Sequence, residues 1–155
     1  MWVTCYTDAS WCPVSSKGGW AYSIVSDRRR FAKSGHCPAW VNCNNTAEMS
    51  AIVAGVYRAV REDDSVEGVS VYTDSMAAID YLRYYYGGVP SLRREDWLLI
   101  RDKLYLILEK YECMIKFTHV KGHRYGRSKQ VYMNNRVDQM AGDARLRNTS
   151  GNTDT

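Results

Sequence analysis

Short runs of apolar residues separated by polar turns mark the strands that this chain is expected to form. The runs Trp2 to Tyr6 and Val69 to Tyr72 both read as buried strands, and an aspartate follows each of them closely. Ala9 to Gly19 is predicted as a turn, because it is rich in serine, proline and glycine. Further strands are predicted at Trp20 to Val25, Phe31 to Cys37 and Met114 to Val120.

Longer segments with apolar residues every three or four positions predict helices. The clearest begins at Asn44 and carries its apolar stripe through Val60. Because this helix joins three consecutive strands to the strand at Val69, that strand is expected to run parallel to the first. Other helices are predicted at Ser75 to Tyr86, from Ser91 onward, and after a basic loop at Lys121 to Met133.

Composition changes this picture little. The chain has 155 residues, of which 45% are hydrophobic and 25% charged, as expected of one globular domain, assigned to residues 1–147 with a frayed polar tail at 148–155. A net charge of +4 permits a polyanionic partner without requiring one. No apolar run of membrane length or signal peptide is present, so we expect no membrane partner and a cytoplasmic or, in a eukaryotic source, nuclear location. No extended apolar surface stripe calls for a dimer, so we expect a monomer.

The five cysteines are expected to be free thiols in a reducing compartment. They include no CxxC pair and no regular zinc-ligand spacing. A metal site formed by His36 with Cys12, Cys37 and Cys43 is the less favoured alternative.

The sequence Tyr6-Thr7-Asp8 recurs as Tyr72-Thr73-Asp74. If the two strands are parallel neighbours, their ends lie about 4.8 Å apart. Two carboxylates so close raise each other's pKa unless a cation neutralises them, which makes the pair a candidate metal site. The alternative is that each aspartate begins a turn or caps a helix.

Three other polar residues are candidates for the same site. Glu48 lies near the start of the helix after Asn44 and could overhang the strand ends, or it could form a reciprocal cap with Asn45. Asn134 and Asp138 are four residues apart and project from one side of the last helix, where an acidic first turn would also suit the helix dipole. His123 lies in the loop just before that helix.

Taken together, these residues resemble type 1 ribonuclease H. The resemblance extends from about Val3 to Ala144 and rests on an ordered set of motifs: Thr7-Asp8-Ala9-Ser10, Asn44-Asn45 with Glu48, Thr73-Asp74-Ser75, Val120-Lys121-Gly122-His123, and Asn134 with Asp138. It implies an α/β fold of the ribonuclease H type, with a five-stranded mixed sheet in the order 3-2-1-4-5, strand 2 antiparallel, flanked by helices.

The resemblance also implies a two-metal mechanism in which Asp8, Glu48, Asp74 and Asp138 bind two Mg²⁺ ions, for which Mn²⁺ could substitute. Asp8 would bridge the ions, and His123 would assist proton transfer or product release. Substrate contacts are implied for Ser10, Asn44, Asn45 and Asn134, with the Asn44-Asn45 pair reading 2′-hydroxyls.

Some features depart from the family pattern. Cys43 stands where many relatives have a threonine that helps hold a DNA phosphate, and Met76 replaces a glutamine. The basic arm of bacterial relatives is also reduced. We hypothesise that the long basic loop after His123 replaces it, with phosphate contacts from Arg124, Arg127 and Lys129; a solvated loop is the alternative.

The sequence therefore predicts a metal-dependent endoribonuclease that cuts the RNA strand of RNA/DNA hybrids and leaves 5′-phosphate and 3′-hydroxyl ends. Two alternatives remain open. One is a DNA nuclease or junction resolvase on the same fold, and the other is an inactive hybrid-binding module.

Overall fold

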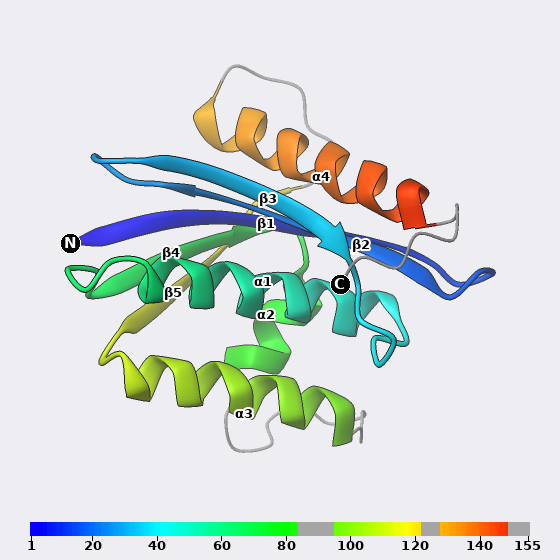
Figure 1. Cartoon of the computed structure of the whole chain (residues 1–155), viewed down its shortest axis with the longest axis horizontal. Helices are drawn as coiled ribbons and strands as arrows, with labels where there is room; N and C mark the ends of the chain where they lie inside the picture. Colours follow the sequence, from blue (N-terminus) through cyan, green and yellow to red (C-terminus); the bar gives the residue numbers. More distant parts are fainter. Residues whose placement is uncertain (84–94, 122–127, 149–155) are drawn as a thin grey trace.

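A computed structural model of the chain describes residues 1–83, 95–121 and 128–148. These residues form a five-stranded sheet with helices on both faces (Figure 1). No helix in the described part of the chain is long and apolar enough to cross a membrane.

The sheet has the predicted strand order, β3-β2-β1-β4-β5. β2 is antiparallel to both of its neighbours, whereas β4 is parallel to β1 and to β5. The first three strands thus form an antiparallel meander, and the helix before β4 makes the predicted crossover that turns β4 parallel to β1. The strands are β1 (Trp2–Cys12), β2 (Lys17–Val25), β3 (Arg30–His36), β4 (Gly68–Thr73) and β5 (Met114–His119).

The predicted turn at Ala9 to Gly19 is mostly strand, and that prediction was wrong at both ends. β1 continues through Asp8 to Cys12, and β2 begins at Lys17, because the two segments pair in register from Thr4↔Val25 to Cys12↔Lys17. The actual turn is confined to residues 13–16, where Ser16 has a positive φ of 55°. Ladder hydrogen bonds outweigh the weak strand propensity of serine and glycine here.

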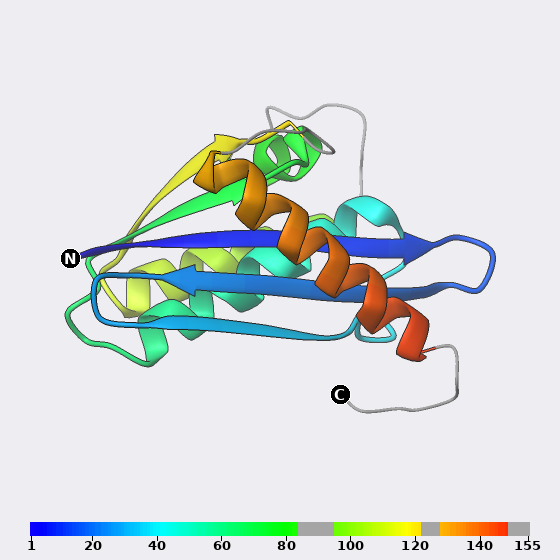
Figure 2. The same ribbon diagram turned by 90° about the horizontal axis from the view of Figure 1, so that it is seen from above.

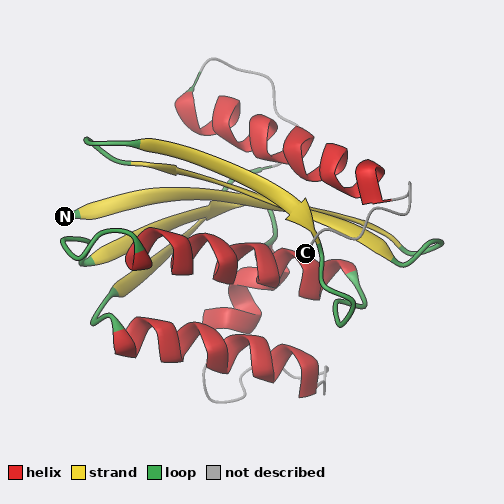
Figure 3. Ribbon diagram, in the orientation of Figure 1, coloured by secondary structure: helices red, strands yellow, loops and turns green. Residues whose placement is uncertain are grey.

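The helices are α1 (Asn44–Arg61), α2 (Met76–Arg83), α3 (Glu95–Lys110) and α4 (Lys129–Asn148). Figures 1 and 3 show α4 on one face of the sheet and α1, α2 and α3 on the other. α4 begins at Lys129, so the loop predicted at Lys121 to Met133 ends earlier than expected. The helix ends at Asn148, one residue past the predicted domain boundary at 147. Predictions at 84–94 and 149–155 fall outside the described residues.

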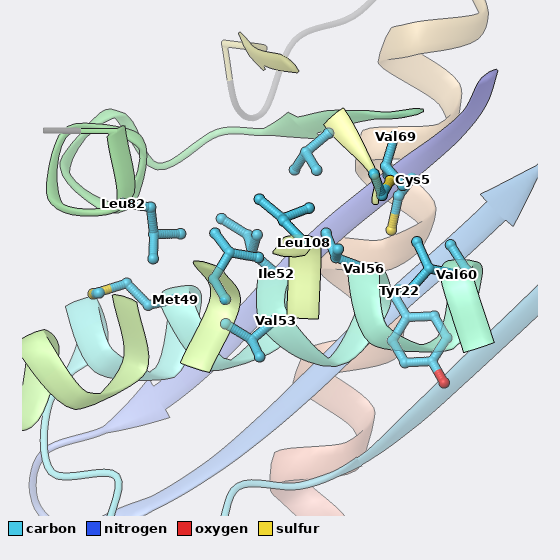
Figure 4. Close-up of a cluster of buried hydrophobic side chains, with 14 of the residues drawn as sticks. Cys5, Tyr22, Met49, Ile52, Val53, Val56, Val60, Val69, Leu82 and Leu108 are labelled. Atoms are coloured by element: carbon cyan, nitrogen blue, oxygen red, sulfur yellow. The ribbon is translucent and has the colours of Figure 1, made fainter. Parts of the chain in front are cut away.

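The main hydrophobic core lies between the sheet and the helices α1, α2 and α3 (Figure 4). α1 contributes Met49, Ile52, Val56 and Val60, all almost fully buried, as its apolar period predicts. Leu82 of α2 packs against the same cluster. Each such side chain stabilises the fold by roughly 1.5–3 kcal/mol through burial, which fixes α1 firmly on the sheet.

A smaller core holds α4 on the opposite face, where Val137 and Ala141 pack on Tyr6 and Ala21. Figure 2 shows α4 crossing β1 and β2 diagonally. The crossing is close at Gly19, where an added Cβ would lie 2.5 Å from the backbone N of Arg145 and 2.9 Å from Ala144 Cβ. The absence of a side chain at Gly19 therefore lets the end of α4 lie directly on β2.

Candidate active site

The strand register places Asp8 and Asp74 together. β1 pairs with β4 from Trp2↔Gly68 to Tyr6↔Tyr72, and each aspartate stands two residues beyond the last pair. β1 continues past that point, so beside Asp8 it has no pairing to β4. This open edge lets side chains from both faces of the sheet approach Asp8.

α1 brings Glu48 to this edge. The N-cap of α1 is Cys43, which forms a reciprocal cap with Thr46: the Cys43 sulfur accepts from Thr46 N at 3.5 Å, and Thr46 Oγ1 accepts from Cys43 N at 3.3 Å. The alternative of a cap between Asn45 and Glu48 is therefore wrong. Glu48 is left free of a capping role and is 5% exposed.

The three carboxylates of Asp8, Glu48 and Asp74 offer oxygen atoms that all lie within 4.8 Å of one another. They are the group in the described part of the chain that could hold a metal ion, and the group contains no cysteine. Asp8 is 2% exposed and Asp74 is half-buried. Asp138 of α4 lies outside the 4.8 Å group, but it is a neighbour of Asp8 and contributes to raising the pKa of that carboxyl.

The electrostatics of this cluster are unfavourable for metal-free, ionised carboxylates. Burial, followed by the charge of Glu48, raises the pKa of Asp8 well above its ordinary range. Burial, followed by the charge of Asp74, raises the pKa of Glu48. Asp8 Oδ1 accepts from Ala9 N at 2.9 Å, but Asp8 Oδ2 and Glu48 Oε2 are buried and receive no hydrogen bond within the described residues.

These residues fit a divalent cation. Buried carboxylate oxygens without donors are costly, and a bound cation would offset both their desolvation and their mutual repulsion. An all-oxygen donor set without histidine or cysteine suits hard ions such as Mg²⁺ or Mn²⁺. Asp8, Glu48 and Asp74 could hold such an ion, and Asp138 lies where it could join them.

α4 presents Asn134 and Asp138 from its interior, not from its first turn, because it begins at Lys129. The helix-dipole explanation for Asp138 is therefore wrong, since that effect is confined to the first turn. Asp138 is half-buried beside Asp8. Asn134 is 3% exposed, so it lies within the α4 interface and presents little surface to a ligand.

The predicted substrate residues within the described part of the chain lie on three different elements. Asn44 is exposed and Asn45 half-buried in the first turn of α1. Ser10 lies on β1, and Lys129 is exposed at the start of α4. The predicted residues His123, Arg124 and Arg127 lie outside the described residues.

Two residues near the site were not predicted. The ring Nε2 of His119, at the end of β5, lies 3.2 Å from the carbonyl oxygen of Asp74, and Arg145 Nε donates to Ser10 Oγ at 2.8 Å. The sequence did contain a clue to Arg145: it follows Asp138 by seven residues, or two helical turns, which places both residues on one side of α4. His119 had no comparable signal, because its position depends on the pairing Thr73↔His119.

Solved structures with this fold share nearly the whole chain at low sequence identity. LC11-RNase H1 in complex with an RNA/DNA hybrid matches with a TM-score of 0.74 and 17% identity, covering 95% of this chain and 99% of the other. The N-terminal RNase H domain from Mycobacterium tuberculosis, solved as a fusion with maltose-binding protein, matches with a TM-score of 0.70 and 17% identity, covering 94% and 99%.

RNase H1 from the halophilic archaeon Halobacterium salinarum matches with a TM-score of 0.66 and 18% identity, covering 96% of this chain and 99% of the other. No curated protein sequence matches the chain significantly. These structural likenesses establish the fold. The family model described as RNase H matches residues 2–145, which is almost the whole described fold including all four carboxylates, and the chain therefore belongs to the RNase H family.

Proposed function

We propose that this chain is a metal-dependent endoribonuclease that hydrolyses the RNA strand of RNA/DNA hybrids, leaving 5′-phosphate and 3′-hydroxyl ends. The observation that carries the proposal is the group of Asp8, Glu48 and Asp74, whose oxygens lie within 4.8 Å of one another at an open strand edge. Membership of the RNase H family supports the same reaction.

The proposed cofactor is Mg²⁺, bound as two ions by Asp8, Glu48, Asp74 and Asp138, with Mn²⁺ able to replace it. When bound, it would supply an activated water and stabilise the leaving oxygen. Burial of Asp8 and Glu48 keeps bulk water away from their oxygens and strengthens their interaction with a cation. Because their pKa values are raised, these carboxylates bind protons in competition with the metal.

Other residues of the chain would bind and orient the substrate. Asn44 and Asn45, in the first turn of α1 close to Glu48 in sequence, would offer their amide groups to 2′-hydroxyls, the groups that distinguish RNA from DNA. His123 is proposed to carry protons or assist product release. Arg124, Arg127 and Lys129 are proposed to contact backbone phosphates.

The test is cleavage of matched RNA/DNA, RNA/RNA and DNA/DNA duplexes with Mg²⁺, with EDTA, and with the Asp74→Asn variant. We expect cleavage of the hybrid alone, abolished by EDTA and by Asp74→Asn. Cleavage of DNA/DNA or of branched DNA instead would favour a DNA nuclease on the same fold. Hybrid binding without cleavage in Mg²⁺ or Mn²⁺ would indicate an inactive binding module.

A further inference from the structure

A hydrogen bond between the end of α4 and β1 fixes an arginine on the strand that carries Asp8. Arg145 Nε donates to Ser10 Oγ at 2.8 Å across a separation of 135 residues in sequence. Both residues are half-buried. Because the guanidinium is anchored through Nε, its orientation is set by the fold, whereas a surface arginine normally samples many rotamers.

The Ser10–Arg145 contact joins the same two elements, β1 and α4, as the neighbouring pair Asp8 and Asp138, and it lies further toward the C-terminal end of each. Ser10 follows Asp8 by two residues on β1, so the two side chains share a face and are about 6.7 Å apart along the strand. Arg145 follows Asp138 by seven residues on α4, two turns or about 10.5 Å along the helix. Asp138 lies against Asp8, and Arg145 against Ser10.

The close crossing at Gly19 makes this arrangement possible. Gly19 is the register partner of Ser10 on β2, and it has room for no side chain beneath Ala144 and the backbone N of Arg145. α4 can therefore approach the sheet closely enough for a side chain on its last turns to reach across β2 to β1. Figure 2 shows this diagonal crossing.

The rest of the guanidinium is available for a ligand. Arginine has five N–H donors, and within the described residues Arg145 uses Nε alone. Its two terminal nitrogens can thus form a bidentate contact with a phosphate. The pKa of Cys12, at the end of β1, is lowered mainly by hydrogen bonds from Ser15 and Val14 and to a smaller extent by the positive charge of Arg145.

We propose that Arg145, held in place by Ser10, binds a backbone phosphate of the RNA/DNA hybrid within about two nucleotides of the carboxylate cluster, given a rise of about 3.4 Å per nucleotide. Ser10 is then a positioning residue that acts through Arg145. This inference rests on the proposed function, and it assigns part of the phosphate binding to the fixed core of the fold rather than to a loop.

The experiment measures hybrid affinity against salt concentration in an Asp74→Asn background with Mg²⁺, by fluorescence anisotropy of a labelled hybrid. Arg145→Gln is expected to lower affinity about tenfold at low salt and to reduce the log–log salt slope by about 0.9, the value for one lost phosphate contact. The matched control is Arg147→Gln, which removes the same charge from the same helical turn but whose guanidinium contacts Ser34 of β3.

Two further variants separate phosphate binding from packing. Ser10→Ala keeps the charge and is expected to weaken binding about threefold with an unchanged salt slope, and the double variant with Arg145→Gln should bind no more weakly than Arg145→Gln alone. If Arg145→Gln does not fold, Arg145→Lys serves instead, with weaker binding but a wild-type slope, because it keeps the charge and loses the bidentate geometry.

An unchanged slope in Arg145→Gln, or an equal loss in Arg147→Gln, would overturn the proposal. Wild-type cleavage of the hybrid is measured in parallel. If the wild type cleaves the hybrid while Arg145→Gln binds it normally, the role of Arg145 alone is wrong. If the wild type neither cleaves nor binds the hybrid, the proposed function is wrong.

Discussion

Tyr6 and Tyr72 are register partners on the parallel strands β1 and β4, and their rings lie 5.1 Å apart between centroids. This pair is the last point at which the two strands are joined. Two residues further on, the strands present Asp8 and Asp74 to the same space. The repeated Tyr-Thr-Asp sequence is therefore a structural repeat as well, since the tyrosine and the aspartate of one copy lie beside those of the other.

Replacing Glu48 with the neutral isostere glutamine should stabilise the metal-free protein at neutral pH, because folding of the wild type then requires Glu48 to take up a proton that the unfolded chain has released. Because the pKa of Glu48 is raised, the folded state binds more protons than the unfolded state between the ordinary carboxyl pKa and the raised value of about 8, so stability falls as pH rises through that window. Each unit of upward shift corresponds to about 1.4 kcal/mol. Thermal unfolding in EDTA from acidic to mildly alkaline pH should show Glu48→Gln gaining on the wild type as pH rises.

The same measurement at low pH provides the control. Below the ordinary carboxyl pKa both states are protonated, so Glu48→Gln and the wild type should have similar melting temperatures there. Equal stability of the two proteins at every pH would show that Glu48 ionises without cost in the folded state.

Metal binding should reverse this destabilisation. Mg²⁺ or Mn²⁺ binds the folded cluster and not the dispersed carboxylates of the unfolded chain, so it is expected to raise the melting temperature, by an amount that corresponds to about 2.7 kcal/mol at a hundredfold excess over Kd. The increase should be larger at neutral pH than in acid, where protons compete. Asp8→Asn should abolish it, whereas Asp143→Asn, an exposed acid on α4, should leave it intact.

Gly19→Ala should destabilise the protein, because the added methyl group would meet the backbone of α4 at Ala141 and Arg145, which cannot rotate away. Overpacking of this kind costs about 1–3 kcal/mol. Gly142→Ala is the matched control, since a Cβ there meets nothing within 4 Å and the helix propensity should improve by up to about 1 kcal/mol. Chemical denaturation measures both, and a neutral Gly19→Ala would contradict the close crossing.

Cys43→Ser should stabilise the start of α1. The cysteine sulfur accepts from Thr46 N at a long 3.5 Å, whereas serine is among the preferred N-cap residues. A gain of about 0.5–1 kcal/mol is expected, with Cys43→Ala below the wild type. If Cys43→Ser and Cys43→Ala unfold at the same denaturant concentration, the cap contributes nothing measurable.

The proposed phosphate contacts of the basic residues after His123 can be tested by removing their charges. Replacing Arg124, Arg127 and Lys129 together with glutamine should reduce the salt slope of hybrid binding by up to about 2.7, or 0.9 for each phosphate contact. The same replacement at Arg28, Arg29 and Arg30, around the β2–β3 turn, is the control for net charge. Equal slopes for the loop variant and the wild type would mean that the loop is merely solvated.

Local sequence patterns predicted most of the helices and strands and their succession along the chain, whereas the strand order in the sheet was implied by the resemblance to type 1 ribonuclease H. The apolar period of residues 49–60 predicted α1, the repeated Tyr-Thr-Asp motif predicted two neighbouring strand ends, and the order of strands and helices predicted a parallel crossover. These predictions succeeded because they depend on side-chain burial with a period of two or 3.6 residues, which a sequence displays directly. Glycine and serine at residues 9–19 misled the same reasoning, because cross-strand pairing outweighed their propensity.

The tertiary structure decided what each polar residue contacts. From spacing alone, Glu48 could equally be a helix cap or a member of the carboxylate cluster. In the structure Cys43 and Thr46 cap α1, and Glu48 is buried beside Asp8. In the same way, the pairing of Ser10 with Arg145 depends on how closely α4 crosses Gly19. Such contacts join residues far apart in the chain, and their distances follow from the packing of whole elements, which no local pattern of residues records.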